Sequence, residues 1–266
     1  MIQFNRYPGG KNNVLTMSYD DGHICDRRLI EIFNQYDIRG SFHLPTHIFN
    51  EEFTEHVKPD EVKELYSSHE ISCHGFWHPS LTIAPASLQV DSILTDRRNL
   101  ERLCDYPVRG MSWPNGHFNS ETISAAKACG IVYSRTAISS KNFARPESFL
   151  VWNPTCHHSN CLDMLNLFFK QRSNYRSNVF YVWGHSSEFE RDKNWNIIEE
   201  FCRQVSGLED VWYATSIEIY DYINAQNQLQ FTADMDKVYN PSVMSVWINA
   251  DNETVEIPGG KTVALK

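Results

Sequence analysis

The chain has 266 residues, 41% of them hydrophobic, with 24 basic and 33 acidic side chains and a formal net charge of −9. This length can bury a large core, either as one α/β barrel with a small appendage or as two domains. The acidic balance argues against a nucleic-acid backbone as a partner. No apolar run reaches the roughly 18 residues that a membrane span requires, so we expect no membrane partner.

The first residues and the cysteines predict a cytoplasmic protein. The start, Met1-Ile2-Gln3-Phe4, lacks the basic and long apolar regions of a signal peptide. Seven cysteines without a repeating spacing are typical of reduced thiols rather than of a disulfide framework. Export would require a leader that has been removed.

Short runs rich in β-branched and aromatic residues alternate with segments of helical period. The predicted strands cover residues 14–19, 38–43, 70–73, 107–113, 131–135, 178–183 and 211–215. The predicted helices cover residues 26–36, 86–103, 120–130, 192–205 and 217–225. This alternation predicts a parallel sheet or barrel with helices outside. The seven strands are one fewer than the standard eight-stranded barrel has.

The pattern changes after residue 225. Runs of β type at residues 245–249, 254–257 and 262–265 are divided by a polar turn at Asp251-Asn252 and by Pro258-Gly259-Gly260. We therefore expect a barrel over residues 1–225 and a C-terminal extension over residues 226–266, built as a β-hairpin that packs on the barrel.

Polar motifs follow three of the predicted strands. Asp20 and Asp21 end the first strand, His74 ends the third and precedes His78, and His185 follows the sixth. Because chemistry in α/β barrels takes place at the carboxyl ends of the strands, we expect these side chains to meet. One Asp and two His suit a divalent cation that keeps open positions, while the second Asp can move protons. The set predicts a metal-assisted hydrolase.

Each motif alone has an ordinary structural explanation. Asp20-Asp21-Gly22 is good tight-turn chemistry, and a pair such as His74 and His78 is often satisfied by hydrogen bonds. The metal site is favoured because the motifs occur together.

The order of four motifs resembles the polysaccharide deacetylase family, which shares the NodB homology domain and belongs to carbohydrate esterase family 4. The motifs are Tyr19-Asp20-Asp21-Gly22, His74-x-x-x-His78-Pro79, Trp113-Pro114-Asn115-Gly116 and Trp183-Gly184-His185. The resemblance spans about residues 14–215. It implies a NodB-like, irregular (β/α)7 barrel that removes N- or O-linked acetyl groups from a carbohydrate.

The resemblance also implies roles for single residues. Asp21, His74 and His78 would bind the metal, usually zinc, with cobalt or nickel as substitutes. Asp20 would be the general base that takes a proton from metal-bound water, and His185 the general acid. The backbone N–H of Asn115 would help to hold the oxyanion.

Several positions depart from the family pattern and bear on the substrate. Ser112 stands where the family usually has an arginine, so Arg109 is a candidate replacement. The family's Asp-Trp motif is not found; its region holds His157, a candidate orienting or substrate group. Trp183 stands where a leucine commonly lines the acetyl pocket, and Trp113 is a further candidate for sugar contact. Glu188 is expected to solvate the surface rather than to orient His185.

Other functions fit parts of the pattern. They are a same-fold amidohydrolase that acts on a non-sugar cyclic amide, a catalytically silent sugar-binding barrel and a non-haem iron oxygenase. Asp20 and His185 favour hydrolysis over the last two. The expected partner is an acetylated carbohydrate or a small amide, and the sequence makes no prediction about oligomeric state.

Overall fold

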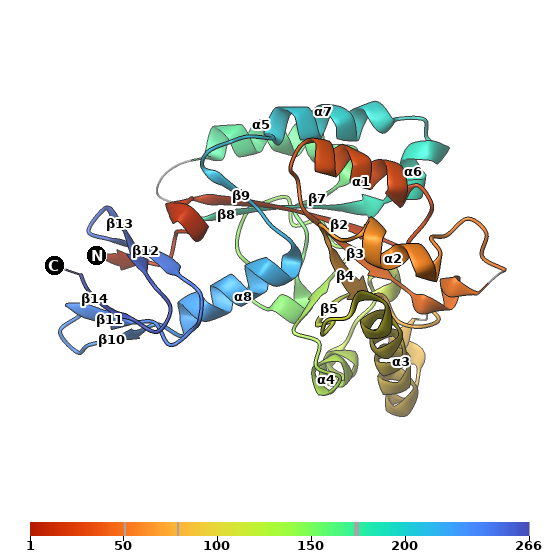
Figure 1. Ribbon diagram of the computed structural model, residues 1–266, viewed down its shortest axis with the longest axis horizontal. Helices are drawn as coiled ribbons and strands as arrows, with labels where there is room; N and C mark the ends of the chain where they lie inside the picture. Colours follow the sequence, from red (N-terminus) through yellow and green to blue (C-terminus); the bar gives the residue numbers. More distant parts are fainter. Residues whose placement is uncertain (51, 79, 173–175, 266) are drawn as a thin grey trace.

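Seven parallel strands form the centre of the protein in the order β6-β5-β4-β3-β2-β8-β7, and β9 also pairs with β2 (Figure 1). The structure is a computed structural model and describes residues 1–50, 52–78, 80–172 and 176–265. The strands are β2 Asn13–Asp20, β3 Gly40–Leu44, β4 Glu70–Cys73, β5 Gly110–Ser112, β6 Tyr133–Arg135, β7 Cys156–His157, β8 Asn178–His185 and β9 Val211–Tyr213.

The barrel closes through an irregular segment between β6 and β8. Trp152 forms a parallel bridge with Arg135 of β6, and the N–H of Thr155 donates to Tyr181 O of β8 at 2.8 Å. The two residues of β7 then continue the pairing with β8. The predicted irregular (β/α)7 barrel is therefore confirmed, with β7 as a short strand that the sequence pattern does not indicate.

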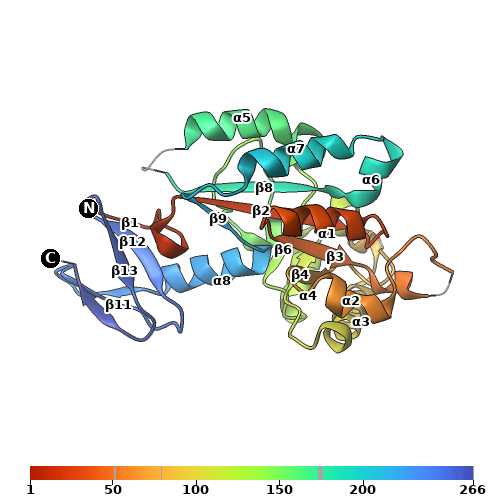
Figure 2. The ribbon, with the colours of Figure 1, turned by 45° about the horizontal axis from the view of Figure 1, so that its top comes forward.

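Helices cover the outside of the sheet. Figures 1 and 2 show α5 and α7 side by side on one face with α1, whereas α3 and α4 lie together on another side. The bounds are α1 Asp26–Gln35, α2 Pro59–Leu65, α3 Ala86–Cys104, α4 Ser120–Ala128, α5 Cys161–Gln171, α6 Ser186–Arg191, α7 Trp195–Val205 and α8 Ser216–Asn227. The predicted helix over residues 192–205 corresponds to α7, which begins at Trp195 after a break in which Lys193 has a positive φ.

The core lies between the sheet and these helices. All eight residues of β2 are buried, as expected for a central strand of a parallel sheet covered on both faces. Helix α7 buries Trp195, Ile198, Phe201, Cys202 and Val205 at helical spacing.

The C-terminal part contains the predicted hairpin within a larger arrangement. Strands β12 and β13 pair around Asp251 and Asn252, whose positive φ values suit a two-residue hairpin turn. The N-terminal strand β1 joins them, and a second antiparallel sheet has the order β10-β11-β14. The bounds are β1 Ile2–Gln3, β10 Gln230–Phe231, β11 Lys237–Tyr239, β12 Val246–Ala250, β13 Glu253–Ile257 and β14 Thr262–Ala264.

These two sheets lie at the amino ends of the barrel strands, beyond α8 (Figure 2). They are therefore far from the carboxyl ends, where the candidate active site lies. The division at residues 225 and 226 stays a prediction, because α8 continues across that position to Asn227.

All seven cysteines are free, and six of them are buried. Within the described ranges, no helix combines the length and the apolar character needed to cross a bilayer.

Candidate active site

The register of the central strands sets the first part of the site. Asp20, the last residue of β2, pairs with His43 of β3 and with His185 of β8. The chain then turns sharply, since Asp21 and Gly22 both have positive φ values and the N–H of Asp21 donates to His43 O at 3.0 Å. Asp20 is consequently buried, while the Asp21 side chain is 39% exposed at the rim. The predicted tight turn exists, and it separates the two carboxylates.

Asp21, His74 and His78 lie together in a geometry that suits a cation. The distances from Asp21 Oδ1 are 3.5 Å to His74 Nε2 and 3.8 Å to His78 Nε2. One ligand atom from each residue lies within 4.8 Å of the others. The predicted ligands are thus brought together at the carboxyl ends of β2 and β4. Pro79, the last residue of that motif, lies outside the described residues.

His74 is oriented by neighbours on two other elements. Its Nδ1 lies 3.0 Å from Ser112 O, which can only accept, so Nδ1 carries the proton and the lone pair of Nε2 faces the rim. Its backbone N–H donates to Asp96 Oδ2 of α3 at 2.8 Å. Such outer contacts fix the tautomer and the ring direction of a metal ligand.

Asp20 forms a buried ion pair with Arg135, the last residue of β6. Its Oδ1 also accepts from Ser112 Oγ at 3.1 Å. Burial alone would raise the pKa of this carboxyl, but the Arg135 guanidinium, with a smaller contribution from His74, holds the pKa well below its usual range. Asp20 therefore stays ionised at neutral pH.

The sequence interpretation missed Arg135 and chose Arg109 instead. Arg109 precedes Gly110, the first residue of β5, so it lies at the amino end of the strand and cannot contact a substrate at the rim. Its guanidinium binds both carboxylate oxygens of Asp221, at 3.0 and 2.6 Å. A basic residue at the carboxyl end of a buried strand, as Arg135 is, was the signal available in the sequence.

His185 lies between two carboxylates. Its Nε2 is 3.7 Å from Asp21 Oδ2, and its Nδ1 is 3.3 Å from Glu188 Oε1. Burial would lower the pKa of His185, but Glu188, with Asp20 and Asp21, raises it above its ordinary value. The prediction that Glu188 only solvates the surface is wrong, because this carboxylate orients the imidazole.

Glu188 is also held by two further imidazoles. Its Oε2 lies 2.9 Å from His157 Nε2 and 3.1 Å from His158 Nε2. Burial would raise the pKa of Glu188, yet the three histidines keep it well below the usual range. Gly184 makes this packing possible, since a Cβ there would lie 2.0 Å from His158 Nδ1.

Ligand atoms of His157, His185 and Glu188 also lie within 4.8 Å of one another. Charge attraction between Glu188 and the histidines accounts for this second cluster better than a metal does. The N–H of Ser159 donates to His157 Nδ1, so the ring proton is on Nε2, which lies 2.9 Å from Glu188 Oε2. That nitrogen has no lone pair to offer a cation in this tautomer.

Trp183 lies in the site beside Arg135. The Arg135 guanidinium is 4.4 Å from the centroid of the indole, and the His157 ring meets the indole edge-on at 5.1 Å. Trp183 and His157 are therefore both near the base and the acid.

Asn115 lies in the turn Pro114–Gly116 directly after β5, with a φ of 58°. In the backbone hydrogen bonds of this turn the donors are the N–H groups of Gly116 and His117. The N–H of Asn115 is not a donor in the turn.

The prediction that Trp113 contacts substrate is wrong. Its side chain is 1% exposed, its Nε1–H donates to Leu150 O at 2.9 Å, and its ring stacks on Phe118. Every face of this indole is used in the core.

Fold and site together define a seven-stranded (β/α) barrel of the NodB type with an Asp-His-His cluster at its rim. Residues 7–134 match the sequence model described as polysaccharide deacetylase. The resemblance seen in the sequence is thereby confirmed. A search of curated proteins found no match.

Solved structures agree on the fold. A protein from Mycobacterium smegmatis assigned to the polysaccharide deacetylases aligns with a TM-score of 0.64 and 17% identity over 83% of this chain and 93% of its own. A peptidoglycan N-acetylglucosamine deacetylase aligns with a TM-score of 0.52 and 14% identity over 82% and 90%. A family pseudoenzyme from Bacillus anthracis aligns with a TM-score of 0.50 and 16% identity over 80% and 66%. At these identities the likeness concerns the fold alone.

The two clusters give a direct test of the metal ligands. Zinc at 100 times its Kd should stabilise the wild-type protein by about 2.7 kcal/mol, because the ion binds the folded state. His78→Ala should remove most of this gain, while the control His157→Ala should keep it. Thermal unfolding with and without zinc measures both. A gain that survives His78→Ala and disappears in His157→Ala would place the ion at the other cluster.

Proposed function

We propose that this protein is a metal-dependent hydrolase that removes acetyl groups, N- or O-linked, from a carbohydrate. The proposal depends on one observation. Three metal-ligand side chains, an ionised carboxylate and an imidazole of raised pKa meet at one end of the barrel. The family match of residues 7–134 supports deacetylation as the reaction type.

Asp21, His74 and His78 would hold the cation. Two imidazole nitrogens and one carboxylate oxygen suit zinc, with cobalt or nickel as substitutes, and leave positions for water and substrate. A divalent cation bound there would lower the pKa of a water ligand and polarise the acyl carbonyl. The orientation of His74 by Ser112 and Asp96 supports this ligand set.

Asp20 is assigned as the general base. The ion pair with Arg135 keeps it ionised and, with Ser112, fixes it in place, so it does not turn outward to become a further ligand. It lies 3.8 Å from His74 Nε2, next to the space that the three ligands enclose. From there its carboxylate can take a proton from an attacking water.

His185 is assigned as the general acid. The contact between its Nδ1 and Glu188 keeps a proton on that nitrogen, and the raised pKa favours a second proton on Nε2, which faces Asp21. Nε2 can then protonate the leaving nitrogen or oxygen. Environments that lower the pKa of one group and raise that of its neighbour are typical of a base and an acid.

We propose that Trp183, which is fixed between Arg135 and His157, lines the acyl side of the site and narrows it to a small acyl group. The N–H of Asn115 remains the proposed oxyanion donor. The same indole favours a second candidate, hydrolysis of a small cyclic amide. A silent sugar-binding barrel is disfavoured because Asp20 and His185 are both present.

The base assignment predicts the effect of Asp20→Asn. Since the amide cannot take a proton from water, kcat should fall roughly 10²–10⁴-fold, while zinc binding persists. Acetate release from a panel of acetylated sugars, with cyclic amides run alongside, measures activity and substrate class together. The exposed control Asp163→Asn should leave kcat unchanged. Near-full activity in Asp20→Asn would remove the proposed base.

The acid assignment predicts a dependence on the leaving group. His185→Ala should reduce kcat most for amides and alkyl esters and least for aryl acetates, whose leaving groups need no proton. Glu188→Gln should show the same trend more weakly, because it disturbs the orientation of His185 rather than removing the ring. The neighbouring control Glu190→Gln should show no such trend. An equal loss across all leaving groups would indicate a binding role for His185.

A further inference from the structure

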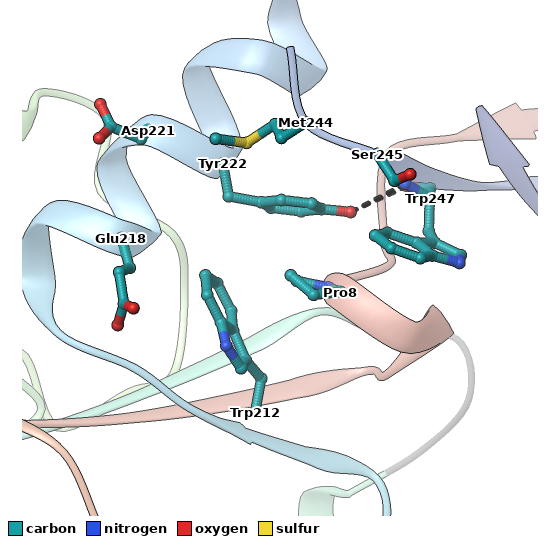
Figure 3. A pocket seen from close by; sticks show the side chains of 8 residues that line it. All are labelled: Pro8, Trp212, Glu218, Asp221, Tyr222, Met244, Ser245 and Trp247. Carbon is teal, nitrogen blue, oxygen red and sulfur yellow. Dashed lines mark hydrogen bonds between the residues drawn. The ribbon is translucent and has the colours of Figure 1, made fainter. Parts of the chain in front are cut away.

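A second cavity, of about 370 Å³, lies at the opposite end of the barrel from the active site. Figure 3 shows it between β9, α8, the segment around Pro8 and the chain that leads into β12. Trp212, on its wall, pairs with Val14 of β2. Asp20 is six residues further along β2, or ~20 Å at about 3.3 Å per residue. The cavity is therefore separate from the catalytic residues.

Three aromatic side chains line the cavity and are held in place: Trp212, Tyr222 and Trp247. Trp212 meets Tyr222 edge-on at 5.6 Å between ring centroids. The Tyr222 hydroxyl accepts from the backbone N–H of Trp247 at 2.9 Å (Figure 3). It donates to Arg6 O at 3.0 Å. Pro8 and Met244 add apolar surface. These walls are preformed, so a ligand would not have to order them.

Polar groups in the cavity are few and balanced in charge. Glu218 is 2.9 Å from Arg39 Nη1, and Asp221 binds Arg109 through both oxygens. Neither carboxylate is therefore an unpaired negative charge.

One polar donor in the cavity is still available to a ligand. Within the part of the chain that the structure describes, the indole N–H of Trp212 has no acceptor and is not sealed from solvent. The indole nitrogen of Trp247 and the carboxylate of Asp221 are turned away from the other lining side chains in Figure 3. An indole nitrogen donates only. The cavity thus offers flat aromatic faces, the N–H of Trp212 and the carboxylate oxygens of Glu218, which have remaining acceptor capacity.

We propose that this cavity is an accessory carbohydrate site that binds one uncharged pyranose unit. The C–H faces of a sugar ring pack on aromatic rings, and its hydroxyls can accept from the indole N–H of Trp212 and donate to the Glu218 carboxylate. Because both carboxylates are already paired with arginines, the cavity favours a neutral, N-acetylated sugar over a cationic amino sugar. The cavity volume lies at the small end of the range for ligand pockets, which suits a single sugar unit. The choice of a carbohydrate rests on the proposed function, whereas the position and the charge preference rest on the cavity itself.

Calorimetric titration of Asp20→Asn with a tetrasaccharide of β-linked N-acetylglucosamine tests the proposal without hydrolysis. We expect binding at two places. Trp247→Ala and Trp212→Ala, each added to that variant, should weaken one of them about fivefold to tenfold. Trp247→Phe, which keeps an aromatic face but loses the N–H, should weaken it less. The control Trp77→Ala changes an exposed tryptophan on the loop after β4 and should leave this component unchanged.

The deacetylated, cationic tetrasaccharide should bind the accessory site no more tightly than the acetylated form does. Three outcomes would each overturn the proposal. The cationic form could bind more tightly, the titration could be insensitive to both cavity tryptophans, or the cavity could bind an apolar dye and no sugar. In an otherwise wild-type chain, Trp247→Ala should keep kcat on a monosaccharide substrate, which also shows that the variant folds. If the wild-type protein released no acetate from any sugar but still bound sugar in a way that depends on Trp212 and Trp247, the proposed deacetylase function would be refuted. The proposed accessory site would not be.

Discussion

The candidate active site depends above all on the register between β2 and β8. Eight residue pairs, from Asn13 with Asn178 to Asp20 with His185, align the two strands so that the proposed base and acid end side by side. A slip of one residue would move every side chain of β2 to the opposite face of the sheet. Because the neighbouring strands are parallel, their carboxyl ends reach the same rim, and His74 after β4 arrives there as well.

Two ionic contacts, one buried and one partly exposed, lower the pKa of the proposed base and raise the pKa of the neighbouring acid. Arg135 supports the charge of Asp20, and Glu188 supports the charge of His185. The family pattern has its arginine at the position of Ser112, whereas here the guanidinium comes from the next strand of the barrel. Ser112 nevertheless contributes, since its hydroxyl contacts both Asp20 and His74.

Much of the site was predictable because each motif follows directly on a buried strand. The positions of Asp20, Asp21, His74 and His185 could be inferred from that local pattern. Arg135 and Asp20 are 115 residues apart, and their contact depends on the curvature of the barrel, which no local pattern encodes. Arg109 was wrongly predicted to lie near the substrate. It precedes β5, which begins at Gly110, so it lies at the opposite end of the strand from the site. The fold class followed from alternation, but the two residues of β7 are too few to show a periodic pattern.

Asp21, His74 and His78 are the proposed metal ligands, and the cluster around Glu188 is proposed only to orient the acid. Anomalous X-ray diffraction from zinc-loaded crystals distinguishes the two clusters directly. We expect one zinc ion within about 2.0–2.2 Å of a carboxylate oxygen of Asp21 and a nitrogen of each of His74 and His78. Zinc between His157, His185 and Glu188, with none at Asp21, would contradict it.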